Sequence, residues 1–375
     1  MSLNDVKSIF LVAGARPNFM KIAPLVRALR ADGRLGWQLI HTGQHYDRDM
    51  NDVFFEELGI PKPDVFMGCG GGSHAEQTAK VMVGFEALCL ERKPDCVLVV
   101  GDVNSTLACA IVAKKLQIPV AHVEAGLRSG DRSMPEEINR LVTDAISDLF
   151  FVTEPSGVEH LVREGKSLSA VHHVGHVMAD NVLYQAAQSP VVSYSAPCEV
   201  AEFKELYGRG RYGVITLHRP SNVDDGSTFS AIGGALREFS RELPLIFPVH
   251  PRTRSNLERF GIDLGARITL VGPQPYMSFL NLWKDAGVVL TDSGGLQEET
   301  TVLGVPCLTL RENTERPITL DEGTNVLVGT NPHAILREAR AVLAGRGKCG
   351  RRPKLWDGRA AERIVSTLVR ELGVI

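Results

Sequence analysis

The sequence predicts an α/β protein built from two doubly wound, parallel-sheet domains of the Rossmann type. Three observations predict this class. Short runs rich in Val and Ile alternate with helical stretches, the alternation occurs twice along the 375 residues, and the runs are continuously apolar. Continuous apolar runs are typical of strands that helices bury on both faces, as in parallel sheets. A chain of this length is also expected to divide into two domains.

Six strands are predicted in each half of the chain. Those of the first half lie at residues 8–14, 37–43, 96–102, 120–126, 149–153 and 171–175. Those of the second half lie at residues 212–218, 245–250, 268–273, 288–292, 306–311 and 325–329.

The segment between the halves predicts where the domains meet. Residues 184–210 have weak periodicity and contain Ser189-Pro190, so a hinge is expected near 175–180. The predicted first domain is 1–177, with a C-terminal helix over 358–375 that crosses back to it, and the second domain is 178–357.

Composition narrows the function classes. Lys plus Arg is 41 and Asp plus Glu is 44, a formal charge of −3, so no nucleic-acid partner is expected. The sequence shows no membrane-length apolar run and no signal peptide, which predicts a cytoplasmic protein without a membrane partner. The seven cysteines form no Cys-x-x-Cys pair, so neither a metal site nor a disulfide framework is expected.

A paired-glycine turn indicates a phosphate site. The segment Asp-Ser-Gly-Gly-Leu-Gln-Glu-Glu at 292–299 directly follows an apolar run. Gly294 and Gly295 let the backbone approach a bulky anion, Ser293 adds a hydroxyl, and the first N–H groups of a helix point at the ligand. Glu299, about one helical turn later, is placed to accept hydrogen bonds from ribose hydroxyls. An ordinary strand-to-helix turn with a solvated Glu pair remains the alternative for this motif alone.

Polar residues also gather at the carboxyl ends of the other predicted strands, the edge at which open α/β sheets bind ligands. Because they come from both halves, they favour one cleft between two domains. They include Arg16, Gln44, His45, Asp102, Glu124, Arg128, His218, Arg219, His250 and Arg252.

Three acids of the first half favour proton-transfer chemistry. Asp102 and Glu124 close neighbouring strands, and Glu136 follows Pro135 at a predicted helix start. Their clustering with His218 and His45 favours catalysis over capping. For single residues the structural alternatives stay open: Asp102 as a helix cap, Glu136 as first-turn charge, and pairing of arginines such as Arg140 with neighbouring acids.

In combination, the motifs of residues 9–329 resemble those of the non-hydrolysing UDP-N-acetylglucosamine 2-epimerases. The motifs are Gly-Ala-Arg-Pro-Asn-Phe-Met-Lys-Ile-Ala-Pro at 14–24, Gly-Asp-Val-Asn-Ser-Thr at 101–106, His-Val-Glu-Ala-Gly-Leu-Arg at 122–128, Pro-Glu-Glu-Ile-Asn-Arg at 135–140, His218-Arg219, the 292–299 segment and Thr-Glu-Arg-Pro at 314–317. The resemblance implies a GT-B arrangement with the active site in the interdomain cleft.

The resemblance also implies residue roles. The catalytic positions are Asp102, Glu124, Glu136 and His218, and the positions that hold UDP are Arg16, Ser293, Gly294, Glu299 and Arg316, with Lys21 at the active-site edge. His45, Arg140, Arg219, His250 and Gly295 are further residues expected to bind the substrate. The implied reaction inverts C2 by anti elimination of UDP to 2-acetamidoglucal and syn return of UDP, without cofactor or metal. Relatives are commonly dimers, so a homodimer is expected.

Three other functions remain open at this stage. A hydrolysing relative would release N-acetylmannosamine and UDP, and an epimerase of a modified UDP-sugar, such as a diacetamido uronic acid derivative, would keep every motif. A GT-B glycosyltransferase or a non-catalytic nucleotide-sugar binding protein would need no acid triad.

The segments 44–51 and 218–222 depart from the corresponding segments of the best-known bacterial members. In those members the side chains of these segments help bind an activating second substrate molecule. Because Pro220 has no side-chain donor, activation by substrate is predicted to be weak or absent.

Overall fold

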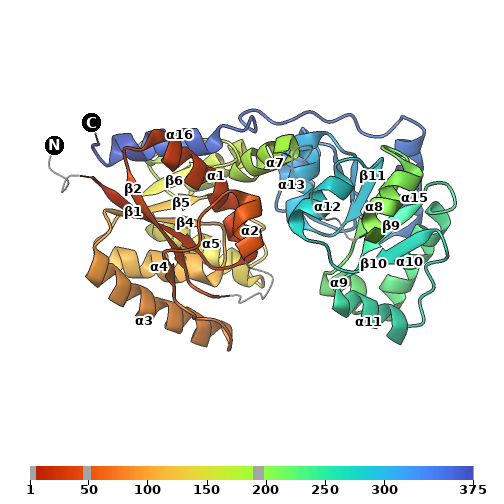
Figure 1. Cartoon of the computed structure of the whole chain (residues 1–375), viewed down its shortest axis with the longest axis horizontal. Coiled ribbons are helices and arrows are strands. Elements are labelled where there is room, and N and C mark those ends of the chain that lie inside the picture. Colours follow the sequence, from red (N-terminus) through yellow and green to blue (C-terminus); the bar gives the residue numbers. More distant parts are fainter. Residues whose placement is uncertain (1–5, 45–51, 189–197, 375) are drawn as a thin grey trace. The chain divides into compact units, whose positions relative to one another are not determined.

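The computed structural model describes residues 6–44, 52–188 and 198–374. The chain forms two compact units, one of Met1–Asn181 with Lys354–Ile375 and one of Val182–Pro353. Each unit contains one sheet whose strands all run parallel, with helices between them, so the predicted α/β class with two parallel sheets is confirmed (Figure 1).

The first unit has a seven-stranded sheet in the order β3-β2-β1-β4-β5-β6-β7. Its strands are β1 (Ser8–Ala13), β2 (Gly36–His41), β3 (Val65–Phe66), β4 (Cys96–Val100), β5 (Val120–Val123), β6 (Leu149–Val152) and β7 (Val171–His173). Its helices are α1 (Arg16–Asp32), α2 (Asp52–Leu58), α3 (His74–Arg92), α4 (Asn104–Lys115), α5 (Pro135–Ile146), α6 (Pro155–Arg163), the short 3-10 helix η1 (Leu168–Ala170) and α16 (Ala360–Glu371), while α7 (Val177–Gln188) contains the boundary between the units.

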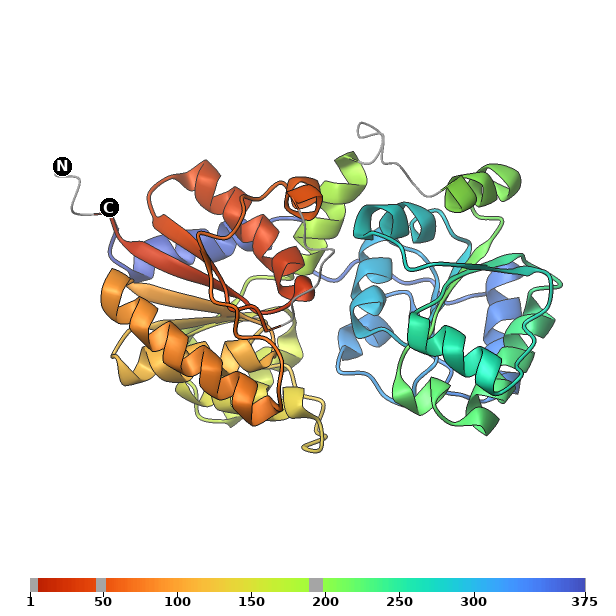
Figure 2. The same cartoon turned by 60° about the horizontal axis from the view of Figure 1, so that its bottom comes forward.

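Helices cover both faces of this sheet. All five residues of the central strand β4 are buried, as its continuous apolar sequence predicts. In both views α3 lies on one face, while α1 and α16 lie on the other, where these two helices pack together (Figures 1 and 2). The Asp180 carboxylate fixes the start of α16 by accepting hydrogen bonds from the N–H groups of Ala360 and Ala361, at 3.2 and 2.8 Å.

The second unit has a six-stranded sheet in the order β10-β9-β8-β11-β12-β13. Its strands are β8 (Gly213–Thr216), β9 (Leu245–Pro248), β10 (Ile268–Val271), β11 (Val288–Thr291), β12 (Cys307–Thr309) and β13 (Asn325–Leu327). Its helices are α8 (Cys198–Tyr207), α9 (Pro220–Val223), α10 (Gly226–Phe239), α11 (Pro251–Arg259), α12 (Tyr276–Trp283), α13 (Gly294–Leu303), α14 (Pro317–Asp321) and α15 (Pro332–Leu343).

Each sheet has one point at which the strand order reverses. It lies between β1 and β4 in the first unit and between β8 and β11 in the second. The connections that leave such a strand pair diverge to opposite faces of the sheet, which opens a crevice at the carboxyl ends where ligands bind. The topology therefore marks the loops after these four strands as the places to look for a site. Among the described residues, no helix combines the length and apolar character needed to cross a bilayer.

Candidate active site

The turn after β1 is tied to the end of β4 by one side chain. Asn18 Oδ1 accepts hydrogen bonds from the N–H groups of Gly14 and Ala15, at 3.1 and 3.0 Å, and its Nδ2 donates to the Val100 carbonyl at 3.1 Å. The segments that follow β1 and β4, the two strands at the switch point of the first sheet, are thereby held in one position. Arg16 follows this turn at the start of α1, where its guanidinium lies 5.2 Å from the centre of the Phe54 ring.

Glu124 is a buried acid in an unusual backbone conformation. Its φ angle is +71°, in the left-handed region that residues with a side chain rarely adopt. Its Oε2 forms an ion pair with Lys21 Nζ, and its Oε1 lies 3.7 Å from His176 Nδ1. Conformations of this kind cost about 1–3 kcal/mol and are found mainly at functional sites, where the surrounding structure enforces them.

Gly101, at the end of β4, permits this arrangement. It has a φ of +70°, and a Cβ atom at this position would stand 3.4 Å from Lys21 Nζ and 3.5 Å from Glu124 Oε2. A larger residue would therefore be strained by the backbone conformation, and its Cβ would contact the ion pair. The end of β4 thus lies directly against the Lys21–Glu124 pair.

Asp102, the next residue, is held by a buried arginine. Arg140 Nη1 pairs with Asp102 Oδ2, while Nε and Nη2 of the same guanidinium donate to Glu137 Oε2 at 2.9 and 2.7 Å. Val103, not Asp102, is the N-cap of α4, and no side chain makes that cap hydrogen bond. The alternative that Asp102 caps this helix is therefore wrong, and its partly exposed carboxylate is instead oriented by Arg140.

Glu137 and Glu136 differ although they are adjacent on α5. Glu137 is buried and accepts hydrogen bonds from the N–H groups of Ser129 and Gly130, at 3.0 and 3.1 Å. Burial raises the pKa of Glu137, but these bonds and Arg140 outweigh burial and hold the pKa below its usual value. Glu136 lies exposed in the first turn of the helix. Of the two acids, Arg140 therefore pairs with Glu137, and Glu136 remains the one open to solvent.

A buried histidine lies beneath the same strand ends. His122 Nδ1 lies 2.7 Å from Asp144 Oδ1, and its Nε2 lies 2.8 Å from the Gly101 carbonyl oxygen. Since both partners are acceptors, both ring nitrogens donate, so the ring is a charged imidazolium. Burial lowers the pKa of His122, but the charge and hydrogen bond of Asp144 outweigh it and raise the pKa above its usual value. The His122–Asp144 pair was not predicted from the sequence. Arg128, for which pairing with an acid was left open beside a role in phosphate binding, pairs with Asp144 at 2.7 Å.

In the second unit, Asp292 organises the loop after β8. This buried carboxylate accepts hydrogen bonds from the N–H groups of His218 and Arg219, at 3.0 and 2.9 Å, and from Asn222 Nδ2 at 3.2 Å. Burial raises the pKa of Asp292, but the bonds and charge of His218 outweigh burial and hold the pKa below its usual value. Asp292 was predicted only as the start of a motif.

Asp292 also orients the His218 ring. His218 Nδ1 lies 3.0 Å from Asp292 Oδ1, and half of the His218 side chain (50%) is exposed. With Nδ1 held by the carboxylate, Nε2 is the nitrogen that can exchange a proton with a ligand. The pair is therefore suited to acid–base chemistry.

The side chain at the start of α13 does not cap the helix. Ser293 is the N-cap residue, yet its side chain makes no cap hydrogen bond. Its backbone N–H donates to Thr291 Oγ1 at 2.9 Å, and Gly294 and Gly295 form the first turn. The first N–H groups of a helix have no partner within it, so they and the Ser293 hydroxyl can receive an anion.

Two acids of α13 have opposite surroundings. Glu298 Oε1 forms an ion pair with Arg316 Nε. Glu299 accepts a hydrogen bond from Tyr276 Oη at 3.3 Å, and burial raises its pKa to about 8. Glu299 therefore holds a proton at neutral pH.

Two other predicted residues lie at the start of α11. His250 is exposed and is the N-cap of α11, where its Nδ1 accepts a hydrogen bond from the Arg252 N–H at 3.3 Å. Arg252 pairs with Asp224, with Nε and Oδ1 3.0 Å apart. A ligand role for His250 stays a prediction, and His45 lies outside the described residues.

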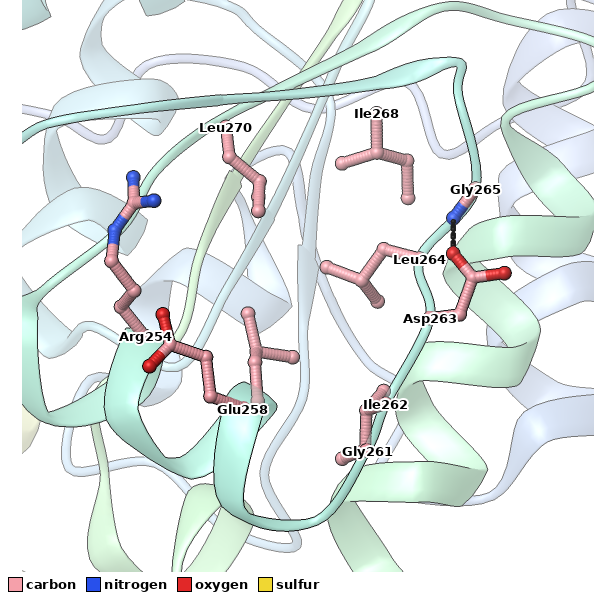
Figure 3. A pocket seen from close by; sticks show the side chains of 10 residues that line it. Arg254, Glu258, Gly261, Ile262, Asp263, Leu264, Gly265, Ile268 and Leu270 are labelled. Carbon is pink, nitrogen blue, oxygen red and sulfur yellow. Dashed lines mark hydrogen bonds between the residues drawn. The ribbon is translucent and has the colours of Figure 1, made fainter.

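A pocket of about 420 Å³ in the second unit lies elsewhere (Figure 3). It is formed by α11, the loop that enters β10, and β10 itself, and its lining mixes apolar side chains such as Ile262 and Leu264 with Glu258 and Asp263. The loop that enters β10 lies at the amino end of this strand, the opposite edge of the sheet from the residues above. This pocket is therefore not part of the candidate site.

Comparison with known proteins assigns the family. The family model for UDP-N-acetylglucosamine 2-epimerase matches residues 27–369. The chain belongs to the UDP-N-acetylglucosamine 2-epimerase family. It is therefore an enzyme of the isomerase class.

Relatives within the epimerase family differ in their named substrates. The chain is 40% identical to the UDP-N-acetylglucosamine 2-epimerase of Methanocaldococcus jannaschii, over 96% of this chain and 98% of that protein. It is also 40% identical to the UDP-2,3-diacetamido-2,3-dideoxy-D-glucuronate 2-epimerase of Pseudomonas aeruginosa, over 89% of this chain and 92% of that protein. A crystal structure of the M. jannaschii enzyme in complex with UDP-GlcNAc and UDP matches 97% of this chain and 99% of that chain, with a TM-score of 0.84 at 39% identity.

Proposed function

We propose that the protein is a non-hydrolysing 2-epimerase that interconverts UDP-N-acetylglucosamine and UDP-N-acetylmannosamine. The observation that carries the proposal is the pair of acids at the carboxyl ends of the neighbouring strands β4 and β5, Asp102 and Glu124, each held by a cation from a different element. Epimerisation at a carbon requires one group that removes a proton and another that returns it to the opposite face. Two oriented carboxylates on neighbouring strands provide such groups.

The reaction proceeds by elimination and re-addition. A base removes the C2 proton, the C2–H electrons form the C1=C2 double bond, and the C1–O bond breaks with its electrons on UDP. In the return step a UDP oxygen bonds to C1, and an acid delivers a proton to the other face of C2. We assign these proton transfers to Asp102, Glu124, Glu136 and His218.

Carboxylates also stabilise the transition state for elimination. Breaking the C1–O bond builds positive charge on the sugar ring, which nearby ionised acids favour. Lys21 and Arg140 orient Glu124 and Asp102 for this role. Loss of a positioned acid or base typically lowers the rate by about 10²–10⁴-fold.

We assign the nucleotide to the second unit. The start of α13, with Ser293, Gly294 and Gly295, receives the pyrophosphate, and Arg219 and Arg316 balance its charge. A helix terminus alone contributes about 0.3–1 kcal/mol to an anion, so the arginines supply most of the binding. Glu299 accepts hydrogen bonds from the ribose hydroxyls.

The second candidate substrate is a UDP-diacetamido-uronic acid. The observation that favours it is the P. aeruginosa relative, which is as similar to this chain, at 40% identity, as the M. jannaschii relative. The two candidates share the nucleotide and the chemistry at C1 and C2, and they differ only in the substituents of the sugar ring.

Proton NMR in D₂O distinguishes the candidates. With UDP-N-acetylglucosamine, the proposal predicts deuterium at C2 together with the appearance of UDP-N-acetylmannosamine. Free N-acetylmannosamine and UDP would show a hydrolysing enzyme instead. Turnover of the UDP-diacetamido-uronic acid alone would support the second candidate, and no exchange with either sugar would overturn the proposal.

A quaternary state is part of the proposal. Because the resemblance points to dimeric relatives, we infer a homodimer. Light scattering after size-exclusion chromatography should give twice the 40.9 kDa of one chain.

A further inference from the structure

We propose that Glu315 is a resident anion of the nucleotide-free protein, which occupies the place of the pyrophosphate at the start of α13 and must leave when UDP binds. The same step frees Arg311, which we infer to be a further pyrophosphate-binding residue. This inference rests on the proposed assignment of the nucleotide to the second unit.

Glu315 and Arg311 lie at the start of α13. A Cβ atom built on Gly294, the first residue of α13, would stand 3.0 Å from Glu315 Oε1 and 3.9 Å from Arg311 Nη1. The Glu315 carboxylate and the Arg311 guanidinium therefore lie directly against the helix start. This is the end of a helix at which the backbone N–H groups favour an anion.

The Glu315 carboxylate is surrounded by positive charge. Arg311 Nη2 donates to Glu315 Oε2 at 2.8 Å, and Arg219 Nη2 lies 3.7 Å from Glu315 Oε1. Arg316 also acts electrostatically on this carboxylate. The guanidinium groups of Arg311 and Arg219 and a helix start thus converge on one carboxylate, with only 11% of its side chain exposed. A single negative charge matches this set less well than a pyrophosphate, which carries more charge and more acceptor oxygens.

One hydrogen-bond donor of Arg311 is not used within the protein residues that the structure describes. Only 7% of the Arg311 side chain is exposed, and its Nη1 has no hydrogen-bond partner among the residues that the structure describes. A buried guanidinium N–H without a partner is costly, so such a group is retained where a ligand completes it. Because Nη1 lies beside Gly294, a phosphate oxygen at the helix start would accept this hydrogen bond.

Glu315 keeps its charge under all ordinary conditions. Burial raises its pKa, but the charges of Arg316 and Arg311 outweigh burial and lower the pKa to about 2. Protonation therefore does not remove the carboxylate near neutral pH, and only displacement does. Glu315 lies in the irregular segment between β12 and α14, so no helix or strand must break for it to move. A competing carboxylate weakens UDP binding and speeds the release of UDP.

The test is calorimetric titration of Glu315→Gln with UDP and with uridine. The isosteric amide keeps the size of the side chain but not its charge, so the Kd for UDP should fall about tenfold, while that for uridine, which has no phosphate, should not change. Glu312→Gln removes the same charge from the same segment and is the matched control, with no expected change. Arg311→Gln should raise the Kd for UDP about tenfold.

Each outcome of these titrations either supports or overturns the proposed role of Glu315. Equal or weaker UDP binding by Glu315→Gln would overturn it, and so would an equal gain for uridine or for Glu312→Gln. Glu315→Asp, which withdraws the carboxylate by one methylene, should give a smaller gain and serves if the amide variant does not fold. Failure of the unaltered enzyme to bind UDP would instead overturn the nucleotide assignment itself.

Discussion

The two sheets carry opposite charge arrangements at equivalent edges. In the first unit the exposed or reactive groups are acids, and cations hold them in place: Lys21 holds Glu124, and Arg140 holds Asp102. In the second unit acids hold the cationic and histidine side chains, as Asp292 holds His218 and Glu298 holds Arg316. The same topology thus presents oriented carboxylates at one edge and an oriented imidazole and guanidinium at the other.

This difference explains why both edges contain buried ion pairs without equal functions. A buried ion pair adds little net stability, because desolvation offsets its attraction, but it fixes the orientation of the partner that faces a ligand. In the first unit the oriented partner is a carboxylate, and in the second it is an imidazole or a guanidinium. Substitutions should therefore separate loss of turnover in one unit from loss of nucleotide affinity in the other.

The largest expected effect follows from Glu124→Gln. The amide keeps the size of the side chain but can neither accept the C2 proton nor stabilise the ring cation, so kcat should fall by about 10²–10⁴-fold. The Kd for UDP should stay within about twofold, because the nucleotide is assigned to the second unit. Turnover by steady-state assay and UDP affinity by calorimetry check both halves, and wild-type turnover would contradict a catalytic role for Glu124.

The next effect concerns the support beneath the acids. His122→Phe replaces the buried imidazolium with an apolar ring and leaves Asp144 with less charge compensation, so the free energy of unfolding should fall by about 3–5 kcal/mol. His172→Phe makes the same change in β7 of the same sheet, at a half-buried histidine whose Nε2 has no hydrogen-bond partner in the described part of the chain. That control should be nearly neutral in chemical denaturation, and equal losses for both variants would show that ring packing alone matters.

The third effect is the pH dependence set by Glu299. Its folded-state pKa of about 8 lies above the ordinary glutamate value of 4.5, so between these pH values the unfolded chain releases a proton that the folded protein keeps. Stability is therefore fully present below pH 4.5 and is lost as the pH rises toward 8, by about 1.4 kcal/mol per pH unit. Compared with the wild type, Glu299→Gln should remove this component in denaturation curves from pH 5 to 8, and parallel curves would argue against it.

Much of the fold could be predicted because each strand appears in the sequence as a short, continuous apolar run. All twelve predicted strands are present, and the missed strand, β3 (Val65–Phe66), has only two residues and an exposed Phe66. The carboxyl ends of parallel strands share one edge, so the approximate place of the candidate residues also followed from the sequence.

The partners of these residues could not be predicted in the same way. Glu136 and Glu137 stand four and three residues before Arg140 on the same helix, so spacing allows either acid to pair with it, and the choice depends on the surroundings of each side chain. The His122–Asp144 pair joins a strand to a helix, and the three bonds to Asp292 join two strand ends. Such contacts depend on how elements pack, which no local pattern specifies.

The smallest expected effect compares two helix starts within the second unit. Ser293 is the N-cap of α13 but makes no cap hydrogen bond, whereas Asn331, the N-cap of α15, accepts bonds from the N–H groups of His333 and Ala334 at 2.9 and 3.3 Å. Asn331→Ala should therefore lower the free energy of unfolding by about 1 kcal/mol and leave UDP binding unchanged. Ser293→Ala should do the reverse, with unchanged stability and a Kd for UDP raised by about fivefold, the loss of one hydrogen bond to a phosphate. Paired thermal unfolding and calorimetry measure both quantities on both variants. If Ser293→Ala destabilised the protein as much as Asn331→Ala, the Ser293 hydroxyl would be a cap and not a ligand group.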